Sequence, residues 1–586
     1  MEGRPNISEY YRNKNILVTG GSGFVGSVLL ESLLRASDVG NIYILIRDGP
    51  KGQSPANRLK RMLEKELFFR QTEESLQKLV AVRGDICEPG LGLNNSDREL
   101  LLKSVNIVFH CAATINFNAN LDAAIKANLL GTKILLDFCK KMTNIESFLY
   151  LSTAFCNSPE KGTVLEKIYP AAASPNTVLK ILENVLETSE KNGYHETEVN
   201  ANGPVVKKPA KNSNGKMSEE ELKLLERDIE KVVRETGVFD PSKGSPSPTW
   251  DMVPHLGGHP NAYTFTKQLA EALLLEENLK FPIVVVRPSI VLGTLKTPFS
   301  GWIDNINSGV CGFLAGCTKG IFRTVLASGD KVSDIIPCDF VVNMCIASAY
   351  KSAVTKTPVE VYHCTSGNIF VINNDNNPSL STGSTNPITY ERYIELVVRA
   401  VKKFPSKELF WYPDARIRSN NIHSRINLIL CHAIPARLVR GVEKILGRNL
   451  TEPHMVIVQG KYDRGMNRTR AFTFRNFDFK YENGTKLEEF LTPEDRETYS
   501  FDPKEIYWPR IIEQCARGVR DYFFRERCDG GDGLRRALVV HTLFYVFFFF
   551  AMKALCVYLL GTLGLEISDW LLFGLAGILT LAYHEL

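Results

Sequence analysis

A glycine-rich string near the start of the chain constrains the fold more than any other feature. It lies between an apolar run at 15–19 (NILVT) and a segment at 28–34 whose apolar residues recur with helical spacing. Glycines let the chain turn tightly and approach a pyrophosphate, and the following helix offers N–H groups and the positive end of its dipole. We therefore predict a dinucleotide-binding turn formed by Thr19, Gly20, Gly21, Ser22, Gly23, Phe24, Val25 and Gly26.

Further apolar runs follow at 41–46, 79–82, 105–109, 147–151 and 282–286, and helical stretches separate them. Short apolar runs that alternate with helices are typical of parallel strands buried on both faces of a sheet. The pattern predicts an α/β fold whose first domain is a doubly wound parallel sheet of the Rossmann type. The chain has 586 residues, which is enough for two or more packed domains.

The residue that ends the second predicted strand usually decides between the two nicotinamide cofactors. An acidic residue there binds the ribose 2′-hydroxyl, and it would repel a 2′-phosphate. Here the strand ends in Arg47, whose guanidinium suits a phosphate, although Asp48 follows it. Arg58 and Lys60 are close in sequence, but we expect them to be solvated residues of a helix. Arg47 therefore indicates NADPH rather than NADH.

Two later strands end in residues that can contact the same cofactor. Asp85 and Ile86 follow the third strand, where the carboxylate can bind the adenine amine and the isoleucine can pack on the ring. After the fourth strand, the small residues Ala112 and Ala113 leave room for the cofactor to pass. We expect His110, which precedes them, to be a packing residue rather than a catalyst.

Tyr263 and Lys267 are four residues apart, so on a helix their side chains project from the same face. Hydride delivery to a carbonyl leaves an oxyanion, and a tyrosine can protonate it if its pKa falls from the usual value of about 10. A nearby lysine ammonium would lower that pKa and could also hold the nicotinamide ribose. Ser152 and Thr153 follow the fifth strand, where a hydroxyl can bind the same oxygen. These residues predict a carbonyl reductase site in which Tyr263 and Lys267 also contact the cofactor.

Two polar stretches divide the rest of the chain. We interpret the first, at about 192–244, as an insertion in the catalytic domain that contains a solvated helix at 216–235. The second, at 373–386, is rich in Asn, Ser and Thr. Beyond it, 390–402 and 425–445 have helical periodicity, and no second glycine-rich loop occurs in the sequence. We therefore predict a smaller, mostly helical second domain.

The most hydrophobic part of the chain is 537–565, which is interrupted only by His541 and Lys553. A second apolar run, at 570–583, is shorter than an ordinary membrane span of about 20 residues. We predict that this tail anchors the protein to membrane lipid, as one crossing, as a hairpin or within one leaflet. Arginines just before the tail favour a cytosolic location for the catalytic part. They are Arg520, Arg525, Arg527, Arg535 and Arg536.

Composition argues against several other classes of protein. The formal net charge of +5 is small for this length and no nucleic-acid-binding motif occurs, so we expect no nucleic-acid partner. The 13 cysteines show no C-x-x-C pair or other metal-ligand spacing, so no metal site is predicted. Because the first residues are polar, we expect no cleaved secretory signal, and we expect reduced cysteines in the cytosol.

The glycine string, the Ser-Thr pair and the Tyr-Lys pair occur in the order of the extended short-chain dehydrogenase/reductase superfamily, which the chain resembles over about 14–343. The resemblance implies that Thr153, Tyr263 and Lys267 are the catalytic residues, with Ser152 as the alternative to Thr153. It also implies that the segment RPSIV lies beside the nicotinamide. That segment adds three cofactor contacts, which are Pro288, Ser289 and Val291.

A closer resemblance, to the fatty acyl-CoA reductases, runs nearly the whole length. It rests on HCAATINFNANL, FLYLSTAFCN, NAYTFTKQLAE and the D-x-x-x-N element at 339–343, and on FTFRNFDF, which looks like part of that family's helical sterile-type domain. Phe477 departs from the family's usual tryptophan, and the polar insertion is a second departure. The resemblance implies an NADPH-binding reductase domain at 1–372, a helical domain at 373–530 and membrane-anchoring segments at 537–583.

The same resemblance implies that a long-chain fatty acyl-CoA is reduced to a primary fatty alcohol and free CoA by two NADPH, through an aldehyde. It implies an intracellular membrane with the catalytic domain facing the cytosol: the endoplasmic reticulum, or alternatively the peroxisomal membrane. Two other functions stay open, namely another membrane-bound enzyme of the superfamily with a sterol or aldehyde substrate, and an idle scaffold. The retained catalytic residues argue against the scaffold, and the helical second domain argues against the other enzymes.

Overall fold

The computed structural model describes residues 4–585 apart from several stretches. The residues outside the description are 118, 193–198, 201–202, 205–218, 237–255, 307–308, 368–370, 373–377, 380–385, 435–436, 438–439, 442–443, 446, 448–454, 528–529 and 563–567. Most of the polar insertion at 192–244 and of the Asn/Ser/Thr-rich stretch at 373–386 therefore lies outside the described residues.

The chain forms two compact units, each assembled from three segments of sequence. Unit 1 comprises Met1–Ser300, Asp334–Pro387 and Asn476–Ile506. Unit 2 comprises Gly301–Ser333, Ile388–Arg475 and Tyr507–Leu586. Each unit therefore combines stretches that are far apart in the sequence.

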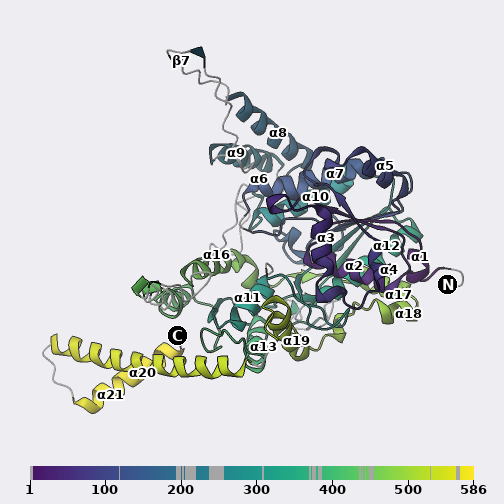
Figure 1. Ribbon diagram of the computed structural model, residues 1–586. Helices are drawn as coiled ribbons and strands as arrows, with labels where there is room; N and C mark the ends of the chain where they lie inside the picture. Colours follow the sequence, from purple (N-terminus) through teal and green to yellow (C-terminus); the bar gives the residue numbers. More distant parts are fainter. Residues whose placement is uncertain are drawn as a thin grey trace. The chain divides into compact units, whose positions relative to one another are not determined.

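Unit 1 is built on a seven-stranded parallel sheet with the strand order β13-β9-β5-β4-β1-β2-β3 (Figure 1). The order reverses beside β1, and the carboxyl ends of the strands at such a switch point form the crevice where ligands bind. The apolar runs predict six of the seven strands, and the doubly wound fold is confirmed. The strands are β1 (Ile16–Thr19), β2 (Ile42–Ile46), β3 (Leu79–Arg83), β4 (Ile107–His110), β5 (Ser147–Leu151), β9 (Ile283–Pro288) and β13 (Val359–Cys364).

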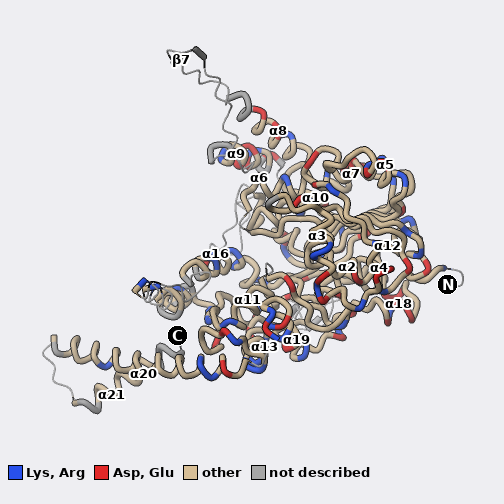
Figure 2. The backbone as a smooth tube through the Cα atoms, in the orientation of Figure 1, with Lys and Arg blue, Asp and Glu red and all other residues tan. Residues whose placement is uncertain are grey.

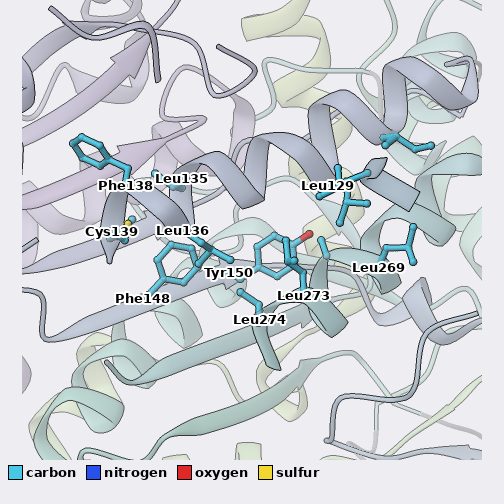
Figure 3. Close-up of a cluster of buried hydrophobic side chains, with 14 of the residues drawn as sticks. Leu129, Leu135, Leu136, Phe138, Cys139, Phe148, Tyr150, Leu269, Leu273 and Leu274 are labelled. Atoms are coloured by element: carbon cyan, nitrogen blue, oxygen red, sulfur yellow. The ribbon is translucent and has the colours of Figure 1, made fainter. Parts of the chain in front are cut away.

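Helices cover both faces of this sheet. On one face, α7 (Gly131–Cys139) and α10 (Ala262–Glu276) share a hydrophobic core with the strands, in which Phe148 and Tyr150 of β5 meet Leu136 and Leu273 (Figure 3). The described residues of α2 (Phe24–Ala36) and α12 (Cys338–Thr355) lie outside this core. These two helices contact each other, and α12 contacts β5 and β9, so they cover the opposite face.

The helix expected at 216–235 forms as α9 (Glu219–Thr236), but it is not solvated on all sides. Leu225 and Ile229 are fully buried in the same hydrophobic core, and α9 packs against α8 (Pro175–Asn192). The expectation of a solvated helix is wrong because the two apolar residues are four positions apart and form one apolar face among many charges.

Unit 2 is mostly helical, as the sequence predicts. The helix expected at 390–402 is α13 (Tyr390–Lys403), and it packs against α19 (Trp508–Gly518). The periodic segment at 425–445 begins as α14 and continues as the π-helical turn η8, and its later part lies partly outside the described residues. Other elements of this unit are α11 (Gly309–Thr318), β11 (Thr324–Leu326), β16 (Arg416–Arg418), α14 (Asn421–Asn427), η8 (Leu428–Ala433), α16 (Met455–Thr473) and η10 (Val519–Phe523).

The hydrophobic tail forms α20 (Gly531–Thr562) and α21 (Asp569–Glu585), two helices in antiparallel contact (Figure 1). Phe573 of α21 lies beside Phe549, with 5.9 Å between ring centroids, and the Lys553 ammonium is 3.6 Å from the Phe573 centroid. The most apolar window of α20 has a mean hydropathy of 2.2, and only 6% of it is buried. Among the described helices, α20 alone is long and apolar enough to cross a membrane.

Candidate active site

The glycine-rich string forms the turn between β1 and α2. Gly20 has a φ of +76°, and a Cβ atom there would lie 2.6 Å from the backbone nitrogen of Ala112. A Cβ on Gly26 would lie 2.2 Å from the carbonyl oxygen of Gly20, so neither position accepts another residue. Gly23 is the N-cap of α2 and has no side chain to cap the first turn. The glycines therefore let the turn pack closely, and the uncapped first turn of α2 offers N–H donors for a pyrophosphate.

The other residues of the string face in different directions. Ser22 is exposed, whereas Phe24 and Val25 are half-buried at the start of α2. A Cβ on Gly21 would lie 2.7 Å from the side chain of Ile44 in β2. Gly21 therefore lets the turn approach the sheet rather than a ligand.

Thr19 and His110 form a buried polar link between β1 and β4. The Thr19 hydroxyl lies 2.7 Å from Nδ1 of His110, and the other ring nitrogen lies 3.0 Å from the hydroxyl of Thr132. Burial lowers the pKa of His110 to about 3, so the ring is neutral. The side chain of Thr19 is thus used within the protein, and only its backbone remains to meet a cofactor.

Two guanidinium groups gather at the end of β2. The Arg47 side chain is 68% exposed and lies 3.6 Å from the carboxylate of Asp85. Arg58, from α3 (Pro55–Leu63), donates a hydrogen bond of 2.6 Å to the carbonyl oxygen of Arg47, so the expectation that it is merely solvated is wrong. Asp48 is paired with Arg83 of β3. The acid that follows Arg47 is therefore neutralised by another arginine.

The residues expected to contact the adenine and the middle of the cofactor lie at the same edge of the sheet. Asp85 also accepts a hydrogen bond of 2.9 Å from the backbone N–H of Cys87. Ile86 is half-buried next to Gly131, where a Cβ would lie 2.9 Å from it. Ala112 and Ala113 are half-buried beside the glycine turn. The structure brings these residues together at the carboxyl ends of β1 to β4.

Tyr263 lies in the first turn of α10, whose N-cap residue Asn261 accepts a hydrogen bond from the backbone N–H of Thr264. The side chain of Thr153 is close to its phenol, and its ring lies 5.6 Å from that of Phe117. Desolvation raises the pKa of Tyr263 above its usual value, and the nearby Thr153 hydroxyl lowers it only in part. The lowered pKa expected from the sequence is therefore not found.

Lys267 is buried one helical turn after Tyr263. Its ammonium donates a hydrogen bond of 2.7 Å to the carbonyl oxygen of Leu151, at the end of β5, and lies 4.5 Å from the ring centroid of Tyr150. Burial lowers the pKa of Lys267 to about 8, and the negative charge of Glu271 opposes that shift. Lys267 is thus directed at the strand that carries Thr153.

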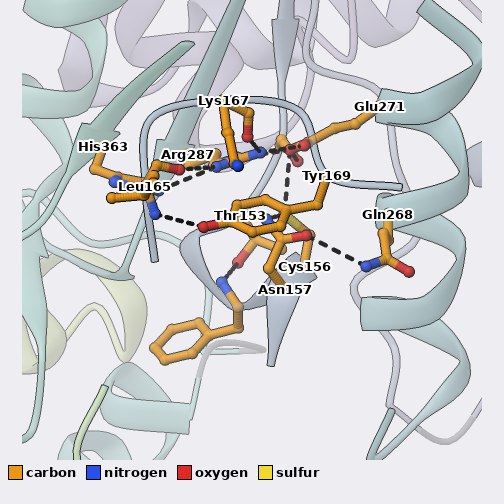
Figure 4. A network of polar contacts seen from close by, with 12 residues as sticks. Thr153, Cys156, Asn157, Leu165, Lys167, Tyr169, Gln268, Glu271, Arg287 and His363 are labelled. Carbon is orange, nitrogen blue, oxygen red and sulfur yellow. Dashed lines mark hydrogen bonds and ion pairs between the residues drawn. The ribbon is translucent and has the colours of Figure 1, made fainter. Parts of the chain in front are cut away.

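Glu271 and Arg287 form a buried ion pair beside Thr153 that the sequence does not predict (Figure 4). Glu271 is one turn beyond Lys267, and its carboxylate accepts hydrogen bonds from Arg287, from the Ser152 hydroxyl and from the Cys156 thiol, the last at 3.1 Å. Ser152 and Cys156 flank Thr153, so Glu271 holds the Thr153 loop on both sides. Ser152 therefore faces Glu271, whereas Thr153 is the hydroxyl that meets Tyr263. The signal available in the sequence is the spacing of Tyr263, Lys267 and Glu271, four residues apart on one helix face.

Arg287 also ties this loop to later parts of unit 1. Its guanidinium donates to the carbonyl oxygens of Leu165 and Lys167, at 3.2 and 2.7 Å, and lies 3.2 Å from Nε2 of His363 (Figure 4). His363 in turn lies 2.7 Å from the carbonyl oxygen of Lys480. The active-site loop is thus linked to the segment Asn476–Ile506 of the same unit.

The same segment packs against the loop through aromatic rings. Strand β17 (Asp478–Phe479) pairs with β6 (Thr163–Val164), and the rings of Phe477 and Phe479 lie 5.3 and 5.8 Å from Phe155, two residues after Thr153. Phe477, where the resemblance implies a tryptophan, makes an aromatic contact with Phe155.

The RPSIV segment forms the end of β9 and the start of β10 (Ile290–Leu292). Pro288 is the last residue of β9, the N–H of Ser289 donates to the carbonyl oxygen of Cys364, and Val291 is half-buried in β10. The D-x-x-x-N element is structural, because Asp339 accepts from the backbone N–H groups of 295–297 and Asn343 donates to the carbonyl oxygen of Ser500 at 2.7 Å.

Comparison with known proteins matches both parts of the chain. The family model described as Male sterility protein matches residues 18–345, and a second model with that description matches residues 431–526. Fatty acyl-CoA reductase 1 of Homo sapiens is 31% identical over 539 residues, which cover 91% of this chain and 89% of the human protein. Fatty acyl-CoA reductase 1 of Gallus gallus is 32% identical with the same coverage.

Among solved structures, the terminal R domain from the myxalamid PKS-NRPS biosynthetic pathway has a TM-score of 0.50 and 16% identity, covering 87% of this chain and 90% of that chain. This likeness concerns the fold alone. The sequence matches are stronger evidence for the family, because they extend over nearly the full length of each relative. They show that this chain belongs to the fatty acyl-CoA reductase family and is an oxidoreductase with a domain that binds a nicotinamide cofactor.

Proposed function

We propose that this protein reduces long-chain fatty acyl-CoA to a primary fatty alcohol and free CoA, with NADPH and through an aldehyde. The observation that carries the proposal is that Thr153, just after β5, and Tyr263, in the first turn of α10, lie close together, while the buried ammonium of Lys267 is hydrogen-bonded to the last residue of β5. Membership in the fatty acyl-CoA reductase family supports the substrate class.

Thr153 and Tyr263 bind the carbonyl oxygen in both reductions. When bound, the reduced nicotinamide supplies one hydride to the carbonyl carbon in each of them. In the first reduction, Tyr263 donates its proton to the thioester oxygen, which gives a hemithioacetal. Its C–S bond then breaks, the hydroxyl proton passes to the leaving thiolate, and the products are an aldehyde and free CoA. Before the second reduction, Tyr263 would recover a proton from solvent, with exchange of the oxidised cofactor for a second NADPH. Tyr263 then protonates the aldehyde oxygen to give the alcohol.

Tyr263 stays protonated at neutral pH, although its raised pKa makes it a weaker acid. A phenol whose pKa lies above 10 is fully protonated at neutral pH, so the acid is available in every molecule. The positive charge of Lys267 then stabilises the phenolate that forms on proton transfer. Lys267 therefore acts during proton transfer, when negative charge develops on Tyr263.

The glycine turn and the β2 end fit NADPH. The closely packed turn at Gly20 and Gly26 presents the N-terminus of α2 to a pyrophosphate, and the exposed Arg47 with Arg58 beside it suits a 2′-phosphate. Asp48 is held by Arg83, so it does not repel that phosphate. By family resemblance, Pro288, Ser289 and Val291 would border the nicotinamide.

We also propose that α20 anchors the enzyme in an intracellular membrane with unit 1 in the cytosol. At about 1.5 Å per residue, the 32 residues of α20 reach about 48 Å, which exceeds the hydrocarbon core of about 30 Å. Figure 2 shows this helix free of acidic and basic residues over most of its length. The endoplasmic reticulum fits the arginines that precede it, with the peroxisomal membrane as the alternative. We further propose that the chain divides by function into a reductase domain at 1–372, a helical domain at 373–530 and membrane-anchoring segments at 537–583.

The experiment is to follow NADPH oxidation by the detergent-solubilised protein with acyl-CoAs of increasing chain length, and to identify the lipid products by mass. Two NADPH consumed and one fatty alcohol formed per thioester are expected, with NADH a much poorer donor. Aldehyde as the final product would overturn the alcohol-forming reaction. Turnover with a sterol and none with any acyl-CoA would overturn the substrate class.

A further inference from the structure

The helix formed by α14 and η8 in unit 2 exposes its apolar face and buries its polar one. Ile422, Ile426 and Ile429 are 67%, 37% and 55% exposed, and their spacing places them on one face. On the opposite side, Ser424 and Asn427 are only 3% and 5% exposed. A helix in contact with water has the reverse arrangement, so this isoleucine face is suited to an apolar partner.

The stretch of sequence that contains the isoleucine face is rich in basic residues. Arg425 is exposed on the same face, three residues after Ile422. Residues 416–448 contain seven Lys or Arg and a single acidic residue, Glu443. An apolar stripe bordered by cations is typical of a helix that lies on a membrane with anionic headgroups. A protein partner would have to combine an apolar groove with acidic residues.

The first turns of α20 are fixed to the same unit just before α14. A Cβ on Gly533 would lie 2.4 Å from the carbonyl oxygen of Ser406, so the two backbones touch. Arg536 donates to the carbonyl oxygen of Lys407 at 3.2 Å. The ring of Trp411 lies 5.9 Å from that of His541. The start of α20 is therefore docked on the loop 405–412.

The contact between the start of α20 and the loop 405–412 indicates where α20 would enter the membrane. Tyr412 and Trp411 contact His541, and Tyr545 lies one turn further on; such rings gather where a span meets the headgroups. The 20 residues from 543 to 562 then cross about 30 Å, which matches the hydrocarbon core. Because α14 begins nine residues after Tyr412, it lies at most about 30 Å from that level.

We propose that α14 and η8 form a second membrane contact, in which the isoleucine face rests in the headgroup region of the leaflet that α20 enters. Arg425 then meets anionic headgroups while Ile422, Ile426 and Ile429 enter the acyl boundary. The proposal rests on the anchoring role proposed for α20. Its consequence is that unit 2 is fixed to the membrane at two points instead of one.

The test is photocrosslinking of the full-length protein in vesicles of phosphatidylcholine and phosphatidylserine. The photoreactive residue p-benzoylphenylalanine replaces Ile429, and two matched positions are controls. Phe547 of α20 is 72% exposed and reports the anchor, whereas Phe69 of unit 1 is 68% exposed and reports an apolar side chain outside both contacts. Lipid adducts are expected at 429 and 547, and the yield at 429 should exceed that at 69 by about tenfold.

The outcomes separate this inference from the anchor. Adducts at 547 without adducts at 429 would overturn the second contact and leave the anchor intact. Adducts at neither position would overturn both. Crosslinks from 429 to a second protein chain would show that the isoleucine face binds another copy, which contradicts the proposal. A lower yield at 429 when phosphatidylserine is omitted would support the role of the cations.

A second variant tests whether the isoleucine face packs against another part of the same chain. Ile422→Gln/Ile426→Gln should leave the thermal unfolding midpoint in detergent unchanged, because both side chains are exposed. A marked fall in the midpoint would mean that they pack against another part of the same chain, and would overturn the proposal.

Discussion

Glu271 and Arg287 form an ion pair that is completely buried, with 2.6 Å between Oε2 and Nη2 and side-chain exposures of 1% and 0%. Removal of one partner from such a pair leaves an uncompensated buried charge and typically costs about 3–5 kcal/mol. The pair is also linked to both sides of the Thr153 loop and lies one turn beyond Lys267. We therefore expect the pair to position Thr153 and Lys267, the residues proposed to be catalytic.

Glu271→Gln should shift the pH dependence of the reaction. Lys267 is needed as a cation and its pKa is about 8, with the Glu271 charge raising it against the effect of burial. Without that charge the pKa falls, so the ammonium loses its proton at lower pH. We expect the alkaline limb of kcat to move down by about one pH unit. The measurement is a pH–rate profile with saturating NADPH.

The control for this variant separates positioning from folding. Glu271→Met/Arg287→Met removes the whole pair, so that no charge is left unpaired, and should retain more thermal stability than Glu271→Gln. Both variants should show the shifted limb. An unshifted limb in a variant that is folded and binds NADPH would mean that Glu271 has a structural role only.

Tyr263→Phe removes the proposed acid and should reduce kcat by about 10²- to 10⁴-fold with NADPH binding retained. Thr153→Ala should reduce kcat by about 10²-fold, because it deletes a hydrogen bond to the developing oxyanion. Ser152→Ala is the matched control, since its hydroxyl faces Glu271 rather than Tyr263. A Ser152→Ala variant as impaired as Thr153→Ala would contradict the assignment of Thr153.

Arg47→Ala should weaken NADPH binding by about 10- to 100-fold and leave the affinity for NADH nearly unchanged, because a charged hydrogen bond to the 2′-phosphate is lost. The measurement is cofactor titration by intrinsic fluorescence. Arg83→Ala provides a comparison, since it frees Asp48 from its ion pair and should also disfavour NADPH. Equal losses for both cofactors in Arg47→Ala would argue against a 2′-phosphate site at the end of β2.

Glu166 should make stability depend on pH. Its carboxylate accepts backbone N–H groups of His363 and Asn483, at 3.0 and 2.6 Å, and burial raises its pKa to about 7. The unfolded carboxyl titrates near 4.5, so the folded state binds more protons between these values, and its stability falls as the pH rises from about 4.5 to about 7.

Glu166→Gln removes this titration. The unfolding midpoints of the wild type and of Glu166→Gln are compared by calorimetry from pH 5 to pH 8. As the pH rises, the midpoint of the wild type should fall relative to that of the variant. A constant difference over that range would show that Glu166 keeps an ordinary pKa in the folded protein.

The sequence predicts those parts of the fold that depend on local pattern. Six strands are recognisable as short apolar runs, and the glycines at 20 and 26 lie between such a run and a helical segment. The seventh strand, β13, is not predicted because Glu360 and His363 interrupt its apolar residues. Their polar groups are paired with Lys351 and with the carbonyl oxygen of Lys480, contacts that no local pattern reveals.

The site is predictable in part for the same reason. Tyr263, Lys267 and Thr153 lie where the motifs place them, whereas the pKa of Tyr263 depends on desolvation by the surrounding protein, which spacing does not report. Arg58 reaches Arg47 because a helix folds back on the strand end. The contact of Phe477 with Phe155 joins residues more than three hundred positions apart. Such pairings require the tertiary structure.

The segment Asn476–Ile506 has a consequence for how the protein is made. All seven strands of the sheet have been synthesised once residue 364 is added, yet Glu166, His363 and Phe155 still lack their partners from 477–483. Domains generally fold one after another from the N-terminus as the ribosome proceeds. Here the loop after β5 lacks these partners for about another 120 residues, so the nascent chain carries an incomplete site while about a fifth of its length is made.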